Sequence, residues 1–202
     1  MGCWSCASAV GPGEPFCPSC RKIQPLDPRE DHFAFLGVPR SYGVDAGQLS
    51  RRFRDLSRLL HPDRFARAGA RERRLSLERS TRLNDAYRTL RHDLLRAEYL
   101  LSLAGRPSPE ARTPADAAFL EEQLLVREAL AEARASGDEA TLRRIAGEGR
   151  ERLERLRTEV AALFAEEEAG RGDRRGEIAR CLARARYHEA AVAEAGGPPA
   201  GR

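Results

Sequence analysis

Apolar residues in this chain recur at intervals of three and four positions, the spacing that lines one face of an α-helix. The clearest stripe follows Asp45 and consists of Leu49, Phe53, Leu56 and Leu60. No stretch of useful length alternates apolar and polar residues in the way that a half-buried strand does. The pattern therefore predicts an all-α protein.

The N-terminal half of the pattern contains a short helix followed by a pair of longer ones. Gly37 and Pro39 end the short helix, which covers about residues 31–38. The helix that begins at Asp45 is followed by another over about residues 71–89. Two helices joined in this way predict a helical hairpin.

The C-terminal half contains three longer helices. Asp116, Asp138 and Asp173 are candidate N-terminal caps for them, because a carboxylate accepts hydrogen bonds from the unpaired N–H groups of a first turn. The connections are short, which predicts an antiparallel three-helix bundle within residues 94–195. Cys181 lies among apolar residues of the last helix, and we expect it to be a buried, unreactive thiol.

Four of the five cysteines lie in the first twenty residues, as Cys3-x2-Cys6 and Cys17-x2-Cys20. Each pair can offer two thiolates to one metal ion from a tight turn, and four thiolates complete a closed tetrahedral Zn²⁺ site. Residues 1–26 are therefore predicted to be a structural zinc-binding arm, whose fold depends on its metal. Residues 22–29, which contain two prolines, are predicted to be a linker.

Two alternatives to zinc use the same four cysteines. Two disulfides would need an oxidising compartment, and the chain has no secretory signal that would take it there. An iron–sulfur or rubredoxin-type iron centre uses the same ligand set and stays open on spacing alone.

Composition narrows the class of protein further. The 202 residues are 41% apolar and 33% charged, and no apolar run approaches the roughly 20 residues that cross a bilayer. The net charge is +4, but 34 of the 35 basic residues are arginine, which indicates coding bias rather than selection for nucleic acid. Residues 1–100 hold 18 basic and 12 acidic side chains, so an acidic partner is expected there. No catalytic Ser/His/Asp set or phosphate-binding glycine loop occurs, so we do not expect an enzyme.

The turn between the paired helices carries the sequence His61-Pro62-Asp63. Proline lacks an N–H and cannot continue a helix, so the histidine and the aspartate are expected to lie on an exposed turn. The preceding helix also has a basic stripe, formed by Arg51, Arg54 and Arg58. On charge alone, a merely solvated surface is the simpler interpretation of that stripe.

The His-Pro-Asp turn, with Asn84-Asp-Ala-Tyr87 on the following helix, resembles a J-domain, the DnaJ-type co-chaperone module. Further segments resemble the HscB family, the J-type co-chaperones of iron–sulfur cluster assembly. These segments are Phe33-x-x-Leu36-Gly-Val-Pro, Arg96-Ala-Glu-Tyr-Leu-Leu101 and Phe119-Leu-Glu-Glu-Gln-Leu-Leu-Val-Arg-Glu128. The resemblance spans residues 31–195, and the four-cysteine arm is similar to that of family members from animal mitochondria.

The resemblance implies an L-shaped protein with a J-domain over residues 31–92 and a bundle over residues 94–195. His61, Pro62 and Asp63 would contact a chaperone of the DnaK or HscA type and stimulate its ATPase. Arg51, Arg54 and Arg58 would steer the protein onto acidic chaperone surface. The bundle would bind an iron–sulfur scaffold protein of the IscU type and deliver it to that chaperone.

The first helix of the bundle has more apolar surface than one packed face needs. Leu120 and Leu124 lie beside Arg127 and Glu128, about a third of a turn from the stripe that faces the bundle. Spacing alone fits either a wide core face or an exposed contact patch. The resemblance favours a patch that binds the scaffold, helped by the aromatic residue Tyr187.

Two residues depart from the family pattern on this helix. Glu121 stands where some members have methionine, and Leu125 stands where they have glutamate. These differences affect how charge contributes to scaffold recognition, but not where we expect it to occur.

Two other functions fit parts of the sequence. A general J-domain co-chaperone would usually carry Gly/Phe-rich and β-rich client-binding regions, which this chain lacks. A zinc-knuckle nucleic-acid-binding protein would need a concentrated basic patch, whereas residues 1–26 contain only Arg21 and Lys22 as basic groups. We therefore expect neither nucleic acid nor membrane as a partner. The chain begins at the cysteines without a transit peptide, so a bacterial, cytoplasmic protein is expected.

Overall fold

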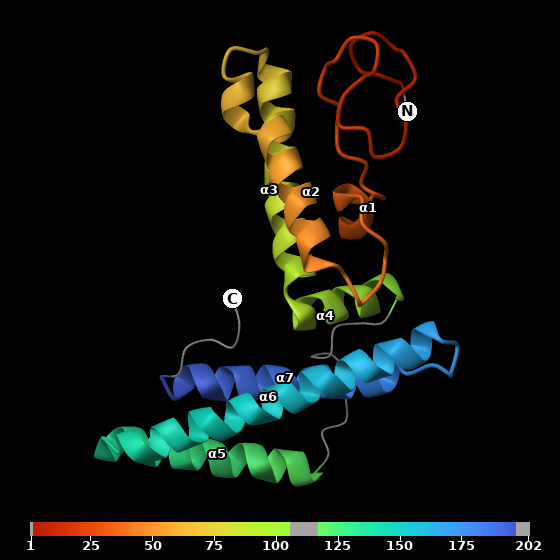
Figure 1. The fold of residues 1–202 in the computed structure, drawn as a ribbon. Coiled ribbons are helices and arrows are strands. Elements are labelled where there is room, and N and C mark those ends of the chain that lie inside the picture. Colours follow the sequence, from red (N-terminus) through yellow and green to blue (C-terminus); the bar gives the residue numbers. More distant parts are fainter. Residues whose placement is uncertain (1, 106–116, 197–202) are drawn as a thin grey trace. The chain divides into compact units, whose positions relative to one another are not determined.

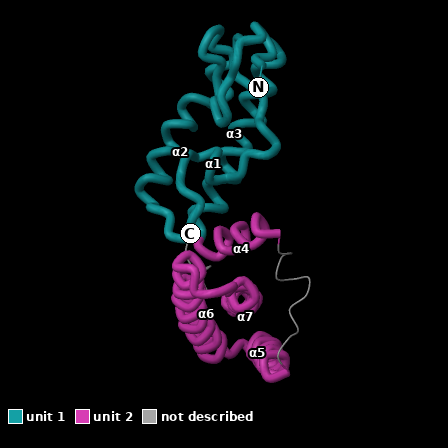
Figure 2. Tube along the Cα trace, turned by 90° about the vertical axis from the view of Figure 1, so that its right-hand side faces the viewer, with its two compact units in different colours: residues 1–92 teal, residues 93–202 magenta. Residues whose placement is uncertain are grey.

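The computed structural model describes residues 2–105 and 117–196. Within these residues it contains seven α-helices, one short 3₁₀ helix and no strand, which confirms the all-α prediction (Figure 1). The chain divides into two compact units, residues 1–92 and 93–202 (Figure 2). No helix in the described part of the chain combines the length and apolarity needed to span a bilayer.

The first unit contains three helices and the 3₁₀ helix, and capping residues explain where they begin and end. Their bounds are α1 His32–Leu36, α2 Ala46–Leu60, η1 Pro62–Phe65 and α3 Ala70–Arg91. The carboxylates of Asp31 and Asp45 accept hydrogen bonds from the first turns of α1 and α2. Gly37 ends α1 in the left-handed conformation, with a φ of 64°.

The core of the first unit lies between α2, α3 and α1. Aromatic stacking contributes to it, because the Phe53 ring of α2 lies 4.1 Å from the Tyr87 ring of α3 between centroids. Phe53 and Leu56 of the expected stripe are only half-buried, since the outer edge of α2 faces solvent. The fully covered residues are Phe33, Leu36, Leu49, Leu60, Leu75, Leu83, Ala86 and Leu90.

The segment expected to be a linker is instead fixed to α3. Ile23 and Gln24 are buried. The guanidinium of Arg79, itself only 3% exposed, donates hydrogen bonds to the carbonyls of Gln24 and Pro25 at 2.7 and 2.9 Å. An irregular segment leaves its carbonyls without partners, and a buried arginine with several donors can satisfy two of them. The linker prediction was therefore wrong over its first half.

The second unit is a helical bundle with one more member than expected. Its helices are α4 Asp93–Leu103, α5 Ala117–Ser136, α6 Glu139–Glu168 and α7 Arg175–Glu194. The last two pack along one another through Leu153, Val160, Ile178, Leu182 and Val192, all fully buried. Arg186 of α7 donates to Glu98 of α4 at 2.5 and 2.6 Å, so α4 joins the three expected helices.

The caps of the second unit follow the sequence with one difference. Asp138 caps α6 by accepting hydrogen bonds from Ala140 and Thr141. At α7, Arg174 occupies the cap position but its side chain makes no capping hydrogen bond, and Asp173, one residue further out, accepts from the N–H of Arg175. The expected cap at Asp116 lies outside the described residues.

Cys181 has the environment that the sequence predicts. It is buried on α7, and burial raises the pKa of its thiol to about 12. A thiol with so high a pKa stays protonated and therefore unreactive near neutral pH.

Two glycines of α6 give a matched pair of tests. A methyl group at Gly149 would meet a side-chain carbon of Val192 at 2.7 Å, whereas one at Gly147 would meet nothing within 4 Å. Gly147→Ala should raise the free energy of unfolding by about 0.5–1 kcal/mol through helix propensity. Gly149→Ala should lower it by about 1–3 kcal/mol through overpacking, measured by urea unfolding. Equal effects of the two substitutions would show that α7 does not approach α6 closely.

Candidate functional site

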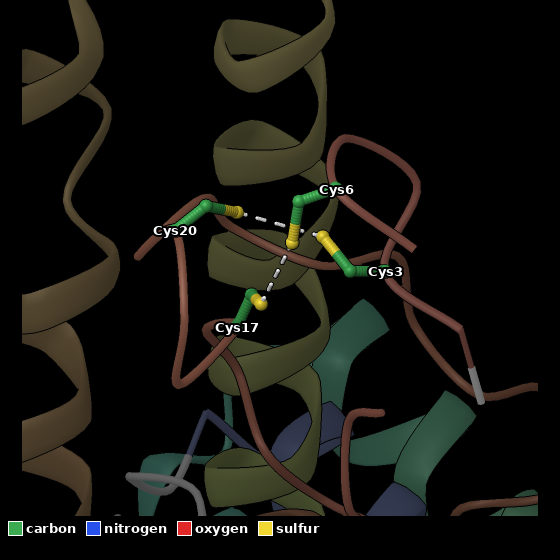
Figure 3. A group of neighbouring side chains, drawn as sticks. All are labelled: Cys3, Cys6, Cys17 and Cys20. Carbon is green, nitrogen blue, oxygen red and sulfur yellow. Dashed lines mark hydrogen bonds between the residues drawn. The ribbon is translucent and has the colours of Figure 1, made fainter. Parts of the chain in front are cut away.

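The four N-terminal cysteines converge on one point. Their Sγ atoms all lie within 4.8 Å of one another, and both Cys3–Cys20 and Cys6–Cys17 are 3.6 Å apart (Figure 3). Four sulfurs held about 2.3 Å from a central ion lie about 3.8 Å apart in a tetrahedron. The spacing therefore fits a single metal ion that prefers thiolate ligands. All four cysteines are free, so the alternative of two disulfides is not observed.

The two cysteine pairs repeat the same backbone turn. The N–H of Ala7 donates to the carbonyl of Cys3 at 3.0 Å, and the N–H of Arg21 donates to that of Cys17 at 2.9 Å. Ala7 and Arg21 both have positive φ, 61° and 58°, a conformation that costs about 1–2 kcal/mol without glycine. The turn that brings two thiols together is therefore strained in each repeat, and a bound metal can offset that cost.

The negative charges of four neighbouring thiolates favour a bound cation. Burial opposes ionisation of Cys3, but hydrogen bonds from the N–H groups of Cys6 and Ser5 lower its pKa to about 6. The backbone N–H of Lys22 favours the thiolate of Cys20, yet burial and the three neighbouring sulfurs raise its pKa to about 12. Four thiolates this close cannot all ionise by themselves, whereas a divalent ion at their centre removes the repulsion.

A buried amide lies next to the cysteine cluster. The side-chain nitrogen of Gln24 donates to the sulfur of Cys3 at 3.4 Å and to the carbonyl of Lys22 at 2.7 Å. Such donors orient a thiolate ligand and stabilise its charge. Gln24 is not predicted from the sequence, because a lone glutamine after a cysteine pair carries no periodic signal.

The His-Pro-Asp turn lies on the surface, as the sequence predicts. Pro62 is the first residue of η1, and the side chains of His61 and Asp63 are both exposed. The imidazole Nδ1 of His61 accepts the N–H of Asp63 at 3.3 Å and lies 3.6 Å from its carboxylate. The turn thus presents an imidazole and a carboxylate side by side to solvent.

Two serines of α3 hold the end of α2 from which this turn begins. The hydroxyls of Ser76 and Ser80 donate to the carbonyl of Leu60 at 2.7 and 2.9 Å. That carbonyl has lost its helical partner because the chain leaves the helix at Pro62. Neither serine is among the residues predicted from the sequence, although their spacing of four residues places them on one face of the helix.

The basic stripe of α2 is fully solvated. Arg51, Arg54 and Arg58 are all exposed, and Arg58 lies 3.8 Å from Asp55 in a surface ion pair. Surface pairs of this kind contribute little to stability. The stripe therefore has no evident structural role and is accessible to a partner.

The first half of α5 presents leucines to solvent. Leu120, Leu124 and Leu125 are 51%, 58% and 60% exposed, and Arg127 and Glu128 beside them are exposed too. A wide core face would bury these leucines, so that interpretation is wrong. We refer to Leu120, Leu124 and Leu125 as the leucine patch.

Tyr187 lies between α7 and α5 rather than fully outside the bundle. Its hydroxyl donates to the carbonyl of Gln123 at 3.1 Å, and its ring meets the Phe119 ring edge-on at 5.5 Å between centroids. Burial raises the pKa of the hydroxyl. The residue is half-buried, so it packs against α5 while part of its surface remains exposed to solvent.

Comparison with known proteins shows to which family the chain belongs. A family model described as the HSCB C-terminal oligomerisation domain matches residues 115–195. The chain is 33% identical over 193 residues to the Arabidopsis thaliana protein "Iron-sulfur cluster co-chaperone protein HscB homolog", a match that covers 96% of this chain and 72% of that one. The chain belongs to the HscB family. It is also 41% identical over 149 residues to the mouse "Iron-sulfur cluster co-chaperone protein HscB", covering 70% of this chain and 64% of the mouse protein.

The fold agrees with a solved HscB structure along nearly the whole chain. The crystal structure of the human co-chaperone protein HscB superposes with a TM-score of 0.84 at 32% identity and covers 97% of each chain. The match with the mouse relative spans just under two thirds of that protein's length. The HscB resemblance seen in the sequence is therefore confirmed.

The cysteine geometry leads to a metal prediction. The purified protein should contain about one metal ion per chain, and Cys17→Ser should lose it because three thiolates no longer close the site. Elemental analysis measures the ion, and circular dichroism should show nearly unchanged helix content, since none of the four cysteines lies in a helix.

Cys181→Ser is the matched control, because this cysteine lies outside the cluster and should leave the metal content unchanged. A reduced wild-type protein without any metal would contradict the site.

Proposed function

We propose that this protein is a co-chaperone of iron–sulfur cluster assembly that stimulates the ATPase of a DnaK or HscA-type chaperone. It would bind an IscU-type scaffold protein and deliver it to that chaperone for cluster maturation. Family membership and the exposed His-Pro-Asp turn support the proposal. The chain acts in this view as an adaptor and a regulator of an ATPase, not as an enzyme.

The chaperone would contact the tip of the α2–α3 hairpin. His61, Pro62 and Asp63 form the contact in this proposal, and their exposed imidazole and carboxylate supply a polar recognition pair. Arg51, Arg54 and Arg58 would increase the rate of encounter with acidic chaperone surface, as solvated charges do. The observation that carries the proposal is that this turn is both exposed and held at Leu60 by two serines.

The scaffold would dock on the outer face of α5. The leucine patch offers apolar area that the bundle leaves in water, with Arg127 and Glu128 as polar neighbours. Tyr187 would contribute by supporting α5 and by its remaining exposed surface. Leu125, which departs from the family pattern, adds a third exposed leucine to this surface.

The arm would bind zinc. Each of the three proposed roles belongs to a separate range of residues along the chain. Zinc suits a closed set of four thiolates, and the elemental analysis described above distinguishes it from iron. We assign residues 1–26 to the zinc arm, residues 31–92 to the J-domain and residues 94–195 to the scaffold-binding bundle. We propose the cytoplasm as its location, since a reducing compartment keeps these thiols available for metal.

The chaperone contact is tested by Asp63→Asn. The carboxylate is 89% exposed, so folding should survive its loss. Stimulation of the chaperone ATPase should disappear, while affinity for the scaffold should stay the same because its residues lie in the other unit. Steady-state ATPase assays and calorimetric titration measure the two effects.

Asp55→Asn is a matched control, because it neutralises another exposed aspartate on the preceding helix. It should leave stimulation nearly unchanged. Full stimulation by a folded Asp63→Asn protein would overturn the chaperone assignment.

The scaffold contact is tested by Leu120→Ala combined with Leu124→Ala. The double variant should weaken binding of an IscU-type scaffold by about 2–4 kcal/mol, the scale of truncated hot spots. Its thermal stability should change little, since both side chains are more than half exposed.

Leu77→Ala provides the control, because Leu77 of α3 is 59% exposed yet lies outside the leucine patch. It should leave scaffold affinity unchanged. A large loss of stability with unchanged affinity would show that the leucines serve the bundle instead.

A further inference from the structure

The second cysteine turn contacts the His-Pro-Asp turn directly. The rings of Phe16, next to Cys17, and Phe65, the last residue of η1, lie 6.5 Å apart between centroids and nearly parallel at 8°. This is the offset stacked arrangement that aromatic pairs prefer. No residue of η1 is buried, so the turn has no core of its own, and Phe16 supplies it with a packing partner.

Two further contacts hold the arm against the start of α3, the helix that follows this turn. The ammonium of Lys22 lies 2.7 Å from the carboxylate of Glu72, whose side chain is mostly buried. The guanidinium of Arg71 lies 4.4 Å from the centre of the Trp4 ring. The indole N–H of Trp4 donates to the carbonyl of Ile23 at 2.7 Å, which ties the first cysteine turn to the second.

The order of the arm depends on its metal. The buried cluster around its metal site consists of Cys3, Val10 and Cys17, too little apolar volume to fold alone, and two of the three are metal ligands in our assignment. A change in metal occupancy therefore changes how firmly Phe16 is held. Through the ring stack, the same change reaches Phe65 and the His-Pro-Asp turn.

We propose that the metal-loaded arm positions the His-Pro-Asp turn for the chaperone, with Phe16 as a positioning residue that acts through Phe65. This inference rests on the proposed co-chaperone function for its effect on ATPase activity, but its structural part does not. His61 and Asp63 stay intact when the arm loosens, so the chemistry of the contact is unchanged. Instead, a smaller fraction of the molecules has the His-Pro-Asp turn in its binding conformation. This weakens the apparent affinity for the chaperone and leaves the maximal ATPase stimulation the same.

The structural part is tested by amide hydrogen exchange in the full chain. Phe16→Ala should speed exchange at Arg64 and Ala66, whose N–H groups close η1 on His61 and Asp63. Zinc content, checked by elemental analysis, should stay at the wild-type level because no ligand is removed. Phe16→Tyr keeps the stacked ring and should restore wild-type exchange.

The functional part is tested in the ATPase assay with increasing amounts of co-chaperone. Phe16→Ala should raise the concentration that gives half-maximal stimulation by about 2- to 10-fold, as expected for an aromatic pair. Maximal stimulation should be unchanged, in contrast to the complete loss expected for Asp63→Asn. Tyr99→Ala, which removes a half-buried aromatic of α4 in the other unit, should change neither quantity.

Lys22 allows a second test of the positioning role, one that does not change the apolar core of the arm. It is the only lysine in the chain, so acylation at this residue, identified by peptide mass spectrometry apart from the N-terminal amine and the cysteine thiols, reports the state of the arm. Removal of zinc, or Glu72→Gln, should increase this reactivity, and Glu72→Gln should speed exchange at η1 as well. This variant decides the question if Phe16→Ala loses its zinc.

The outcomes separate this inference from the proposed function. Unchanged exchange at η1 in both Phe16→Ala and Glu72→Gln would overturn the positioning role, whatever the ATPase assay shows. Faster exchange with an unchanged half-maximal concentration would overturn its link to the chaperone. If the wild-type protein stimulates no DnaK-type chaperone, the proposed function fails, while the exchange data still decide whether the arm holds the turn.

Discussion

Pro62 is the constraint on which the first unit depends. It ends α2 at Leu60 and leaves the carbonyl of that residue without a helical partner. Ser76 and Ser80 of α3 then bond to this carbonyl, which joins the two helices at the tip of the hairpin. One proline thus both exposes the His-Pro-Asp turn and creates the unpaired carbonyl by which the turn is anchored.

A side chain of α3 also fixes the arm by hydrogen bonds to backbone carbonyls. The buried guanidinium of Arg79 pairs with two carbonyls of the segment after the last cysteine and fixes it along α3. A guanidinium taken out of water is costly unless its donors are used, and burial lowers the pKa of Arg79 accordingly. The arm is therefore not a separate appendage, since its position is determined by α3, the helix on which it lies.

The sequence predicts the helices of this protein well, because caps, prolines and apolar spacing are local signals. Asp45 and Asp138 cap the helices as expected, and the four cysteines converge. The contacts it does not predict join residues distant along the chain, such as Phe16 with Phe65 and Arg79 with Gln24. In a chain with 34 arginines, no local pattern distinguishes Arg79, the buried one among the described residues.

For the leucine patch, the spacing along the sequence fits either a core face or an exposed surface, and the exposed fractions in the structure decide between them. The inner face of α5 already packs through Val126, Leu130 and Ala133, and its N-terminal half is held by Phe119 against Tyr187. Further leucines add nothing to that core, so their exposure has no benefit for stability. Three exposed leucines within six positions of a well-anchored helix are instead the arrangement that a protein partner can cover.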